Sequence, residues 1–408
     1  MKFGKRAFKS LLKPALIILI AVIISANYRP IQEKVHNGIY WVYEQNETIG
    51  DALFEFNRTV FNGTEFDTER LTKHAIYSSY PSVVMITTRS TTPGNNGGGT
   101  GTGFFTKIEG DHAWVVTNNH VIGEAKLQPG KWAVTVNTAL DMWTYDAEIV
   151  GVDEIADIAV LKITKQDNED WEILEWEDPK KIGVGSPVTV VGHGMSLPWT
   201  STSGIISYTG RYGTRPYSLM LQIDAVINQG NSGGPVIGSN GKVVGVAQSI
   251  LSPGRGVPGW DGVGLAVGSA QAQRSIDYIM SPKYASKGYV PYAEYPFALG
   301  TFELKDVKDT DRKDRHYAYF DYSKQTEETP QTVGEASGIQ QGDILLEIDG
   351  EPVRSSWGVL TRTVLAFPGE EWIVKVRRDN KDVEITIVLR EMDRQQLLNS
   401  IARPGGGR

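Results

Sequence analysis

The sequence of 408 residues contains no cysteine and only six histidines. The absence of cysteine excludes disulfides and thiolate metal sites, and the histidines show no ligand spacing, so we expect no metal and no cofactor. The net charge of −7 argues against a nucleic-acid partner, because such proteins present a basic face. The 40% hydrophobic content and the 44 glycines fit turn-rich globular domains, and the length indicates two or three of them.

The amino-terminal 27 residues have the composition of a membrane-targeting segment. Five basic residues precede the apolar run Ala15–Ile24, which places the amino terminus in the cytoplasm and the rest of the chain across the membrane. We expect residues 1–27 to be an uncleaved transmembrane anchor, and a cleavable signal peptide is the alternative. A mature amino terminus at Asn27 would identify the signal peptide.

Residues 28–71 show apolar spacings of four and three. This heptad-like pattern predicts either an oligomerising coiled-coil stalk or an amphipathic helix on the body of the protein. Gly38 and Gly50 weaken a long helix. The residues of the pattern are Val35, Ile39, Val42, Asn46, Ile49, Leu53, Phe56 and Val60.

The segment Asp224–Pro235 places Ser232 inside a glycine-rich turn. Glycine permits backbone angles that side chains forbid, so such a turn can expose a hydroxyl beside converging amide groups. Acyl transfer requires that arrangement, in which an oxygen nucleophile lies beside donors for a developing negative charge. The alternative interpretation is an ordinary turn between two strands.

Two other segments supply the groups that activate a serine. Ala113–Thr117 predicts a buried strand that leads to His120, and Ile155–Ile163 predicts an apolar strand with Asp157 at its entrance. Imidazole is a suitable base near neutral pH, and a carboxylate fixes its tautomer. The chain order of these three residues is that of chymotrypsin-like enzymes.

Thr117–Ile122, Asp157–Leu161 and Gly230–Gly234 resemble the three catalytic blocks of the Deg/HtrA family of serine proteases. The resemblance covers about residues 72–281 and implies a mainly β, chymotrypsin-like double β-barrel. It implies the catalytic triad His120, Asp157 and Ser232. His193 is a rival base, but the family has a non-catalytic residue there, so we expect His193 to line the cleft or to be solvated.

The same resemblance implies an oxyanion hole formed by the amides of Gly230 and Ser232. Asn231 replaces the aspartate that digestive enzymes pair with a new amino terminus, so activation by that route is not expected. We expect instead that ordering of this loop controls activity. The residues around Val226–Asn228 and Gln248–Leu251 predict a primary pocket without an acidic group, suited to small or medium aliphatic side chains.

Residues 337–353 resemble the central block of a PDZ domain, which we expect over residues 293–392, after a linker at 282–292 and before a tail at 393–408. PDZ domains add an extended peptide to a sheet edge and hold its carboxylate on backbone amides. By resemblance, the carboxylate loop and the pairing strand are expected to include Leu299, Gly300, Thr301 and Phe302. Trp357, Leu360 and Val364 are expected either to form the opposite wall of the groove or to pack in the core.

These observations predict a membrane-anchored serine endopeptidase that cleaves unfolded or exported proteins and is regulated by peptides at its PDZ domain. By resemblance we expect a homotrimer with its catalytic domain outside the cytoplasm, which is the periplasm if the source cell is Gram-negative. The alternative is a non-catalytic chaperone or peptide-binding protein on the same fold. The intact triad residues argue against this alternative.

Overall fold

A computed structural model describes residues 65–138, 143–165, 171–194, 199–212, 217–250, 262–297, 304–306, 316–319, 331–353 and 356–402. The predicted membrane segment and residues 28–64 of the predicted stalk lie outside these ranges. No helix in the described ranges combines the length and the apolar character needed to cross a bilayer. Residues His74–Arg408 form one compact unit, and helix α4 spans Glu65–Ser79.

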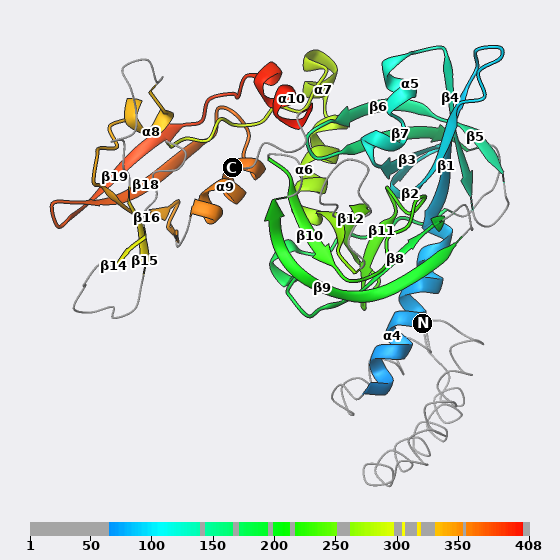
Figure 1. The fold of residues 1–408 in the computed structure, drawn as a ribbon, viewed down its shortest axis with the longest axis horizontal. Helices are drawn as coiled ribbons and strands as arrows, with labels where there is room; N and C mark the ends of the chain where they lie inside the picture. Colours follow the sequence, from blue (N-terminus) through cyan, green and yellow to red (C-terminus); the bar gives the residue numbers. More distant parts are fainter. Residues whose placement is uncertain are drawn as a thin grey trace, which may run out of the picture. The chain divides into compact units, whose positions relative to one another are not determined.

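The first half of the catalytic region is a seven-stranded sheet, coloured blue to cyan in Figure 1, with the strand order β5-β4-β1-β2-β3-β7-β6. Its strands bury β-branched and aromatic residues, among them Val115, Phe105 and Tyr145, which suits a pleated surface with one face in a core. The strands are β1 Val83–Ser90, β2 Gly98–Glu109, β3 His112–Thr117, β4 Trp132–Thr138, β5 Thr144–Asp146, β6 Glu148–Asp153 and β7 Ile158–Thr164.

The second half is a closed six-stranded barrel with the order β10-β13-β12-β11-β8-β9, green in Figure 1. Closure removes the exposed strand edges, and the interior is filled by small and branched apolar side chains such as Val190 and Ile223. The strands are β8 Pro187–Gly192, β9 Thr200–Tyr212, β10 Leu219–Ile223, β11 Pro235–Gly238, β12 Val243–Ile250 and β13 Gly264–Gly268. The chain therefore has the expected mainly β catalytic region.

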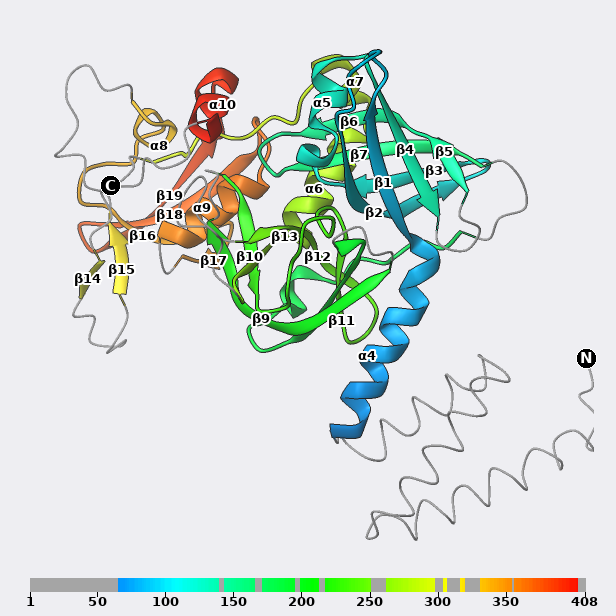
Figure 2. The same cartoon turned by 45° about the vertical axis from the view of Figure 1, so that its right-hand side comes forward.

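A third sheet follows, with the order β14-β15-β16-β18-β19 and β17 beside β16 (Figure 2). Strands β18 and β19 form a hairpin closed by Asp379 and Asn380, which both have positive φ, as a two-residue type I′ turn requires. The strands are β14 Leu304–Asp306, β15 His316–Tyr319, β16 Ile344–Ile348, β17 Glu351–Pro352, β18 Glu371–Arg378 and β19 Lys381–Val388.

The helices connect and cover these sheets. A capping box begins α8, in which the Thr332 hydroxyl accepts from the Glu335 amide and the Glu335 carboxylate accepts from the Thr332 amide. Gly288 in the left-handed conformation ends α7. The helices are α5 Gly123–Leu127, α6 Ser269–Ile279, α7 Pro282–Lys287, α8 Val333–Ala336, α9 Ser356–Leu365 and α10 Arg394–Ala402.

Two parts of the expected carboxyl-terminal region are closely packed. Val364 is completely buried within a core cluster, so it packs in the interior and does not line an open groove. The predicted linker contains helix α7, and its Tyr292 is 1% exposed. The segment before the third sheet is thus packed against the protein along part of its length.

Candidate active site

His120 lies in a short helical turn, Asn119–Val121, directly after β3. The position of this turn is fixed by the backbone carbonyl of Asp157, which accepts hydrogen bonds from the Asn119 amide at 3.1 Å and from the Asn118 side chain at 2.9 Å. Strands β3 and β7 are paired along their length, and this pairing brings two segments 37 residues apart in sequence into contact. The two predicted catalytic residues therefore meet because their strands are neighbours.

The Asp157 carboxylate holds His120 at two points. Its Oδ1 accepts from the His120 amide at 2.9 Å, and its Oδ2 lies 2.7 Å from the imidazole Nδ1. Asp157 is 1% exposed, whereas the His120 side chain is 41% exposed. Because the carboxylate accepts at Nδ1, the imidazole proton is held there and the Nε2 lone pair is left to act as a base.

Gln248 on β12 is a site residue that the sequence assigned to another role. Its Nε2 donates to Asp157 Oδ2 at 3.0 Å, and the side chain is buried. Besides its predicted place in the wall of the primary pocket, Gln248 thus bonds the carboxylate that orients His120. The two residues lie 91 positions apart, and no local pattern signals this contact.

Ser232 is joined to the same neighbourhood through Gln248. The Ser232 hydroxyl donates to the Gln248 carbonyl at 2.9 Å, and the Ser232 carbonyl accepts from the Thr102 amide at 2.9 Å. A Cβ atom at Gly101 would lie 2.6 Å from the side chain of Val121, the neighbour of His120, and 3.2 Å from the Ser232 carbonyl oxygen. The serine turn and the histidine turn therefore flank the same residue of β2.

The turn itself depends on glycine. Gly233 has a φ of +87°, and a Cβ atom there would lie 2.2 Å from both the Thr102 carbonyl oxygen and the Thr117 hydroxyl. Gly230 has a φ of +101°, and its carbonyl accepts from the Thr102 hydroxyl at 2.7 Å. In the described ranges, the amides of Gly230 and Ser232 donate to no other residue, which is the state that an oxyanion hole requires.

Asn231 lies completely buried between these residues, and neither polar atom of its amide has a partner in the part of the chain that the structure describes. Gly192 and Gly194 approach it closely, since a Cβ atom at either would lie about 3 Å from Asn231 Oδ1. Unpaired buried amides are uncommon in native proteins. The loop beside the nucleophile is thus less completely bonded than the residues around Asp157.

His193 is buried, so the expectation that it lines the cleft or is solvated is wrong. Its ring lies against Trp199 with centroids 5.0 Å apart, and its amide donates to the Thr102 hydroxyl at 3.0 Å. Burial lowers the pKa of His193 to about 4, against an opposing contribution from the Val84 backbone. A neutral, enclosed imidazole of this kind is poorly suited to the role of rival base.

The remaining predicted sites differ in how far the structure describes them. The expected carboxylate loop, Leu299–Phe302, lies outside the described residues, as does the loop at residues 251–261. Within the described part of the chain, no three His, Cys, Asp or Glu side chains are grouped as metal ligands would be.

The domain composition follows from comparison with known families. Residues 101–246 match the family described as the trypsin-like peptidase domain, and residues 329–389 match the PDZ domain family. A trypsin-like peptidase domain thus precedes a PDZ domain in this chain. Its geometry at His120 and Asp157 agrees with that assignment.

Curated relatives include proteins named "Probable periplasmic serine endoprotease DegP-like". The protein from Rhizobium meliloti (strain 1021) is 30% identical over 288 residues, which cover 70% of this chain and 52% of the relative. The protein from Chlamydia trachomatis serovar D is 30% identical over 310 residues, covering 75% and 56% respectively. The chain spans about half the length of the curated relatives it matches.

Among solved structures, the chain is similar to that of the "HtrA-type protease AlgW with tripeptide". The TM-score is 0.57 at 23% sequence identity, and the match covers 79% of this chain and 97% of the other. At this identity the likeness supports the fold.

Proposed function

We propose that the protein is a serine endopeptidase of the Deg/HtrA type, in which Ser232 is the nucleophile, His120 the general base and Asp157 its orienting carboxylate. The observation that carries this proposal is the bond between His120 Nδ1 and Asp157 Oδ2, which leaves Nε2 available as a base, with Val121, the neighbour of His120, and Ser232 both close to Gly101. The names of the relatives and the trypsin-like domain match support the same activity.

In the proposed reaction, the Ser232 hydroxyl leaves the Gln248 carbonyl and turns to His120, which accepts its proton as the oxygen attacks the scissile carbonyl. The amides of Gly230 and Ser232 stabilise the oxyanion of the tetrahedral intermediate. His120 then protonates the leaving amine, and water hydrolyses the acyl-enzyme with His120 again as the base. Asp157 stabilises the imidazolium in both steps.

The finer features are proposals of the same kind. Relatives named as periplasmic support a catalytic domain outside the cytoplasm, and the charged amino-terminal segment supports an anchor. The PDZ match and the tripeptide named with the AlgW structure support peptide binding, and we propose Leu299–Phe302 as the carboxylate loop on the resemblance of the sequence to PDZ domains. We propose a homotrimer on the resemblance of the sequence to trimeric members of the family.

Replacement of Ser232 by alanine tests the reaction. We expect the Ser232→Ala variant to lose casein cleavage by a factor on the order of a million in kcat, because the nucleophile is removed. A fluorophosphonate probe should label the unmodified enzyme and not the variant. Casein cleavage that survives in the variant would refute the mechanism, and an unlabelled, inactive parent enzyme that still binds casein would favour the chaperone.

A further inference from the structure

Asp153, at the end of β6, is a buried carboxylate that the proposed reaction does not use. It is 1% exposed, and each of its oxygens accepts two hydrogen bonds. Oδ1 accepts from the amides of Ile155 and Ala156 at 3.0 and 3.1 Å. Oδ2 accepts from the hydroxyls of Ser275 and Tyr292, both at 2.7 Å. Four donors thus surround one carboxylate, and their hydrogen bonds offset part of the burial that raises the pKa of Asp153.

The two amides bonded to Oδ1 belong to the turn that ends at the catalytic Asp157. Asp157 has a φ of +60°, a left-handed conformation that is uncommon for residues other than glycine. Such a backbone persists when its surroundings fix it from several sides. Asp153 fixes the turn on its amino-terminal side, and the bonds of the Asp157 carbonyl and carboxylate to the histidine turn fix the other.

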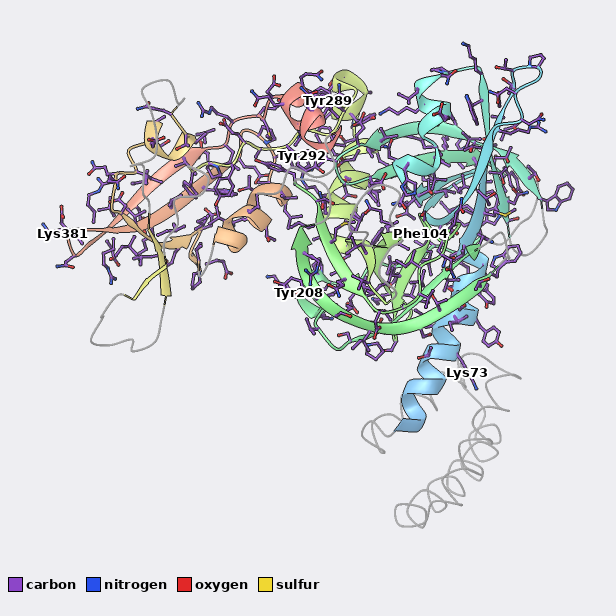
Figure 3. The ribbon with its side chains drawn as sticks, in the orientation of Figure 1. Lys73, Phe104, Tyr208, Tyr289, Tyr292 and Lys381 are labelled. Atoms are coloured by element: carbon purple, nitrogen blue, oxygen red, sulfur yellow. The ribbon has the colours of Figure 1, made fainter. Side chains whose placement is uncertain are left out.

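The two hydroxyls bonded to Oδ2 come from elements distant in the sequence. Ser275 lies on α6, and Tyr292, labelled in Figure 3, lies in the segment between α7 and the third sheet. Burial raises the pKa of Tyr292 well above its ordinary value, so the phenol keeps its proton and acts as a donor. Gln271 donates to the Tyr292 oxygen at 3.2 Å, which fixes the direction of that donor.

We propose that Asp153 is a positioning residue for Asp157, the carboxylate that orients His120, and that Tyr292, in the interdomain segment, holds Asp153 in place. The proposal depends on the proposed function only in that Asp157 is taken as this orienting carboxylate. Removing the Tyr292 hydroxyl leaves Oδ2 with one donor in place of two and loosens the turn. The imidazole of His120 then loses alignment, which lowers kcat and leaves the substrate-binding surface unchanged.

Arg274 connects the same cluster to the PDZ domain. Its guanidinium lies 4.5 Å from the ring centroid of Tyr292 and 4.0 Å from that of Phe367. It donates to the carbonyls of Pro291, Leu365 and Ala366, at 2.7, 3.0 and 2.8 Å. Arg274 thus connects the segment that contains Tyr292 to the carboxyl-terminal end of α9.

The test compares three variants of the full-length protein. Tyr292→Phe removes the hydroxyl that reaches Asp153 and keeps the ring. Asp153→Asn removes the charge and replaces one of the two accepting oxygens with an NH2 group, which donates. Tyr217→Phe is the matched control, because its hydroxyl accepts from the Tyr295 amide in the same segment and has no bond to Asp153. The measurements are kcat and KM for casein cleavage and the downfield proton NMR resonance of His120 Nδ1–H.

We expect Tyr292→Phe to lower kcat about tenfold and Asp153→Asn about a hundredfold, with KM unchanged, since small misplacements of catalytic groups have effects of this size. Both should shift or broaden the His120 resonance, and Tyr217→Phe should leave it in place. Equal losses of kcat in Tyr292→Phe and Tyr217→Phe would overturn the proposal, as would an unchanged resonance in Tyr292→Phe. A parent protein that shows the resonance but cleaves nothing would reject the proposed function and leave the positioning measurable.

Discussion

The surroundings of Asp157 and of Asn231 differ in how completely their polar groups are bonded. Asp157 accepts three hydrogen bonds on its carboxylate, from the His120 amide, the His120 ring and Gln248. Asn231 is equally buried, yet neither atom of its amide has a partner in the described ranges. The Asp157 carboxylate is held by His120 in the turn after β3 and by Gln248 on β12, whereas the serine turn is held mainly through its backbone.

This difference indicates where the site can change. A buried carboxylate that accepts several hydrogen bonds resists displacement, because each lost bond leaves its charge with fewer partners inside the protein. Displacement of the Asn231 side chain breaks no hydrogen bond within the described ranges. The bonds of its turn include the backbone bonds from the Gly233 amide to the Ala247 carbonyl and from the Gly234 amide to the Asn231 carbonyl. The contrast supports the expectation that activity is controlled by ordering of the loop around Ser232, and not by movement of Asp157.

The largest expected change in activity comes from substitutions of Gln248, which bonds the Asp157 carboxylate. Gln248→Glu places a second carboxylate beside Asp157 Oδ2, and like charges at that distance disfavour one another's ionisation. We expect kcat for casein to fall about a hundredfold, and about tenfold in Gln248→Met, which loses the hydrogen bond without adding charge. Gln396→Glu, an exposed change on α10, is the control. Full activity in Gln248→Glu would show that the third bond to Asp157 has no catalytic role.

The three residues of the proposed triad could be singled out from the sequence because each lies at the end of a recognisable local element. The apolar run before His120 forms β3, the run after Asp157 forms β7, and the glycines around Ser232 form the expected turn. Gln248 and Asp153 gave no such signal. Their roles depend on contacts between residues 91 and 139 positions apart. The first contact joins β12 of the closed barrel to the residue before β7 of the first sheet, and the second joins the end of β6 to the interdomain segment.

His193 shows the opposite case, in which a local pattern is misleading. A histidine between Gly192 and Gly194 has the composition of an exposed turn. The absence of side chains at these glycines instead lets Asn231 approach within about 3 Å of where a Cβ would lie, and the loop is enclosed. Glycine here permits close packing, which a single sequence does not distinguish from flexibility.

Burial of His193 predicts a pH dependence of stability on the serine side of the site. Its pKa in the folded protein is about 4, below the ordinary value of 6.5, so the unfolded chain binds the proton more tightly. The stabilisation is therefore present above about pH 6.5 and is lost as the pH falls towards 4. Between pH 7 and pH 5 we expect a loss of about 2 kcal/mol in the free energy of unfolding.

Urea unfolding of the parent protein and of His193→Gln at both pH values isolates this contribution. The difference between the two proteins should shrink on acidification, since only the parent has to release a proton from this ring on folding. His112→Gln keeps His193 and should follow the parent. A pH dependence that is the same in His193→Gln as in the parent would mean that this imidazole is hydrated in the folded state.

The smallest expected effect compares two buried asparagines directly. Asn118→Ala removes a hydrogen bond to the Asp157 carbonyl and should cost about 1–2 kcal/mol in the free energy of unfolding. Asn231→Ala removes an amide without bonded partners in the described ranges, so we expect a cost below about 1 kcal/mol, limited to lost packing against Gly192 and Gly194. If urea unfolding shows Asn231→Ala to be the more damaging change, its amide is bonded in solution. The loop around Ser232 is then as firmly held as the Asp157 carboxylate, and ordering of this loop no longer explains how activity is controlled.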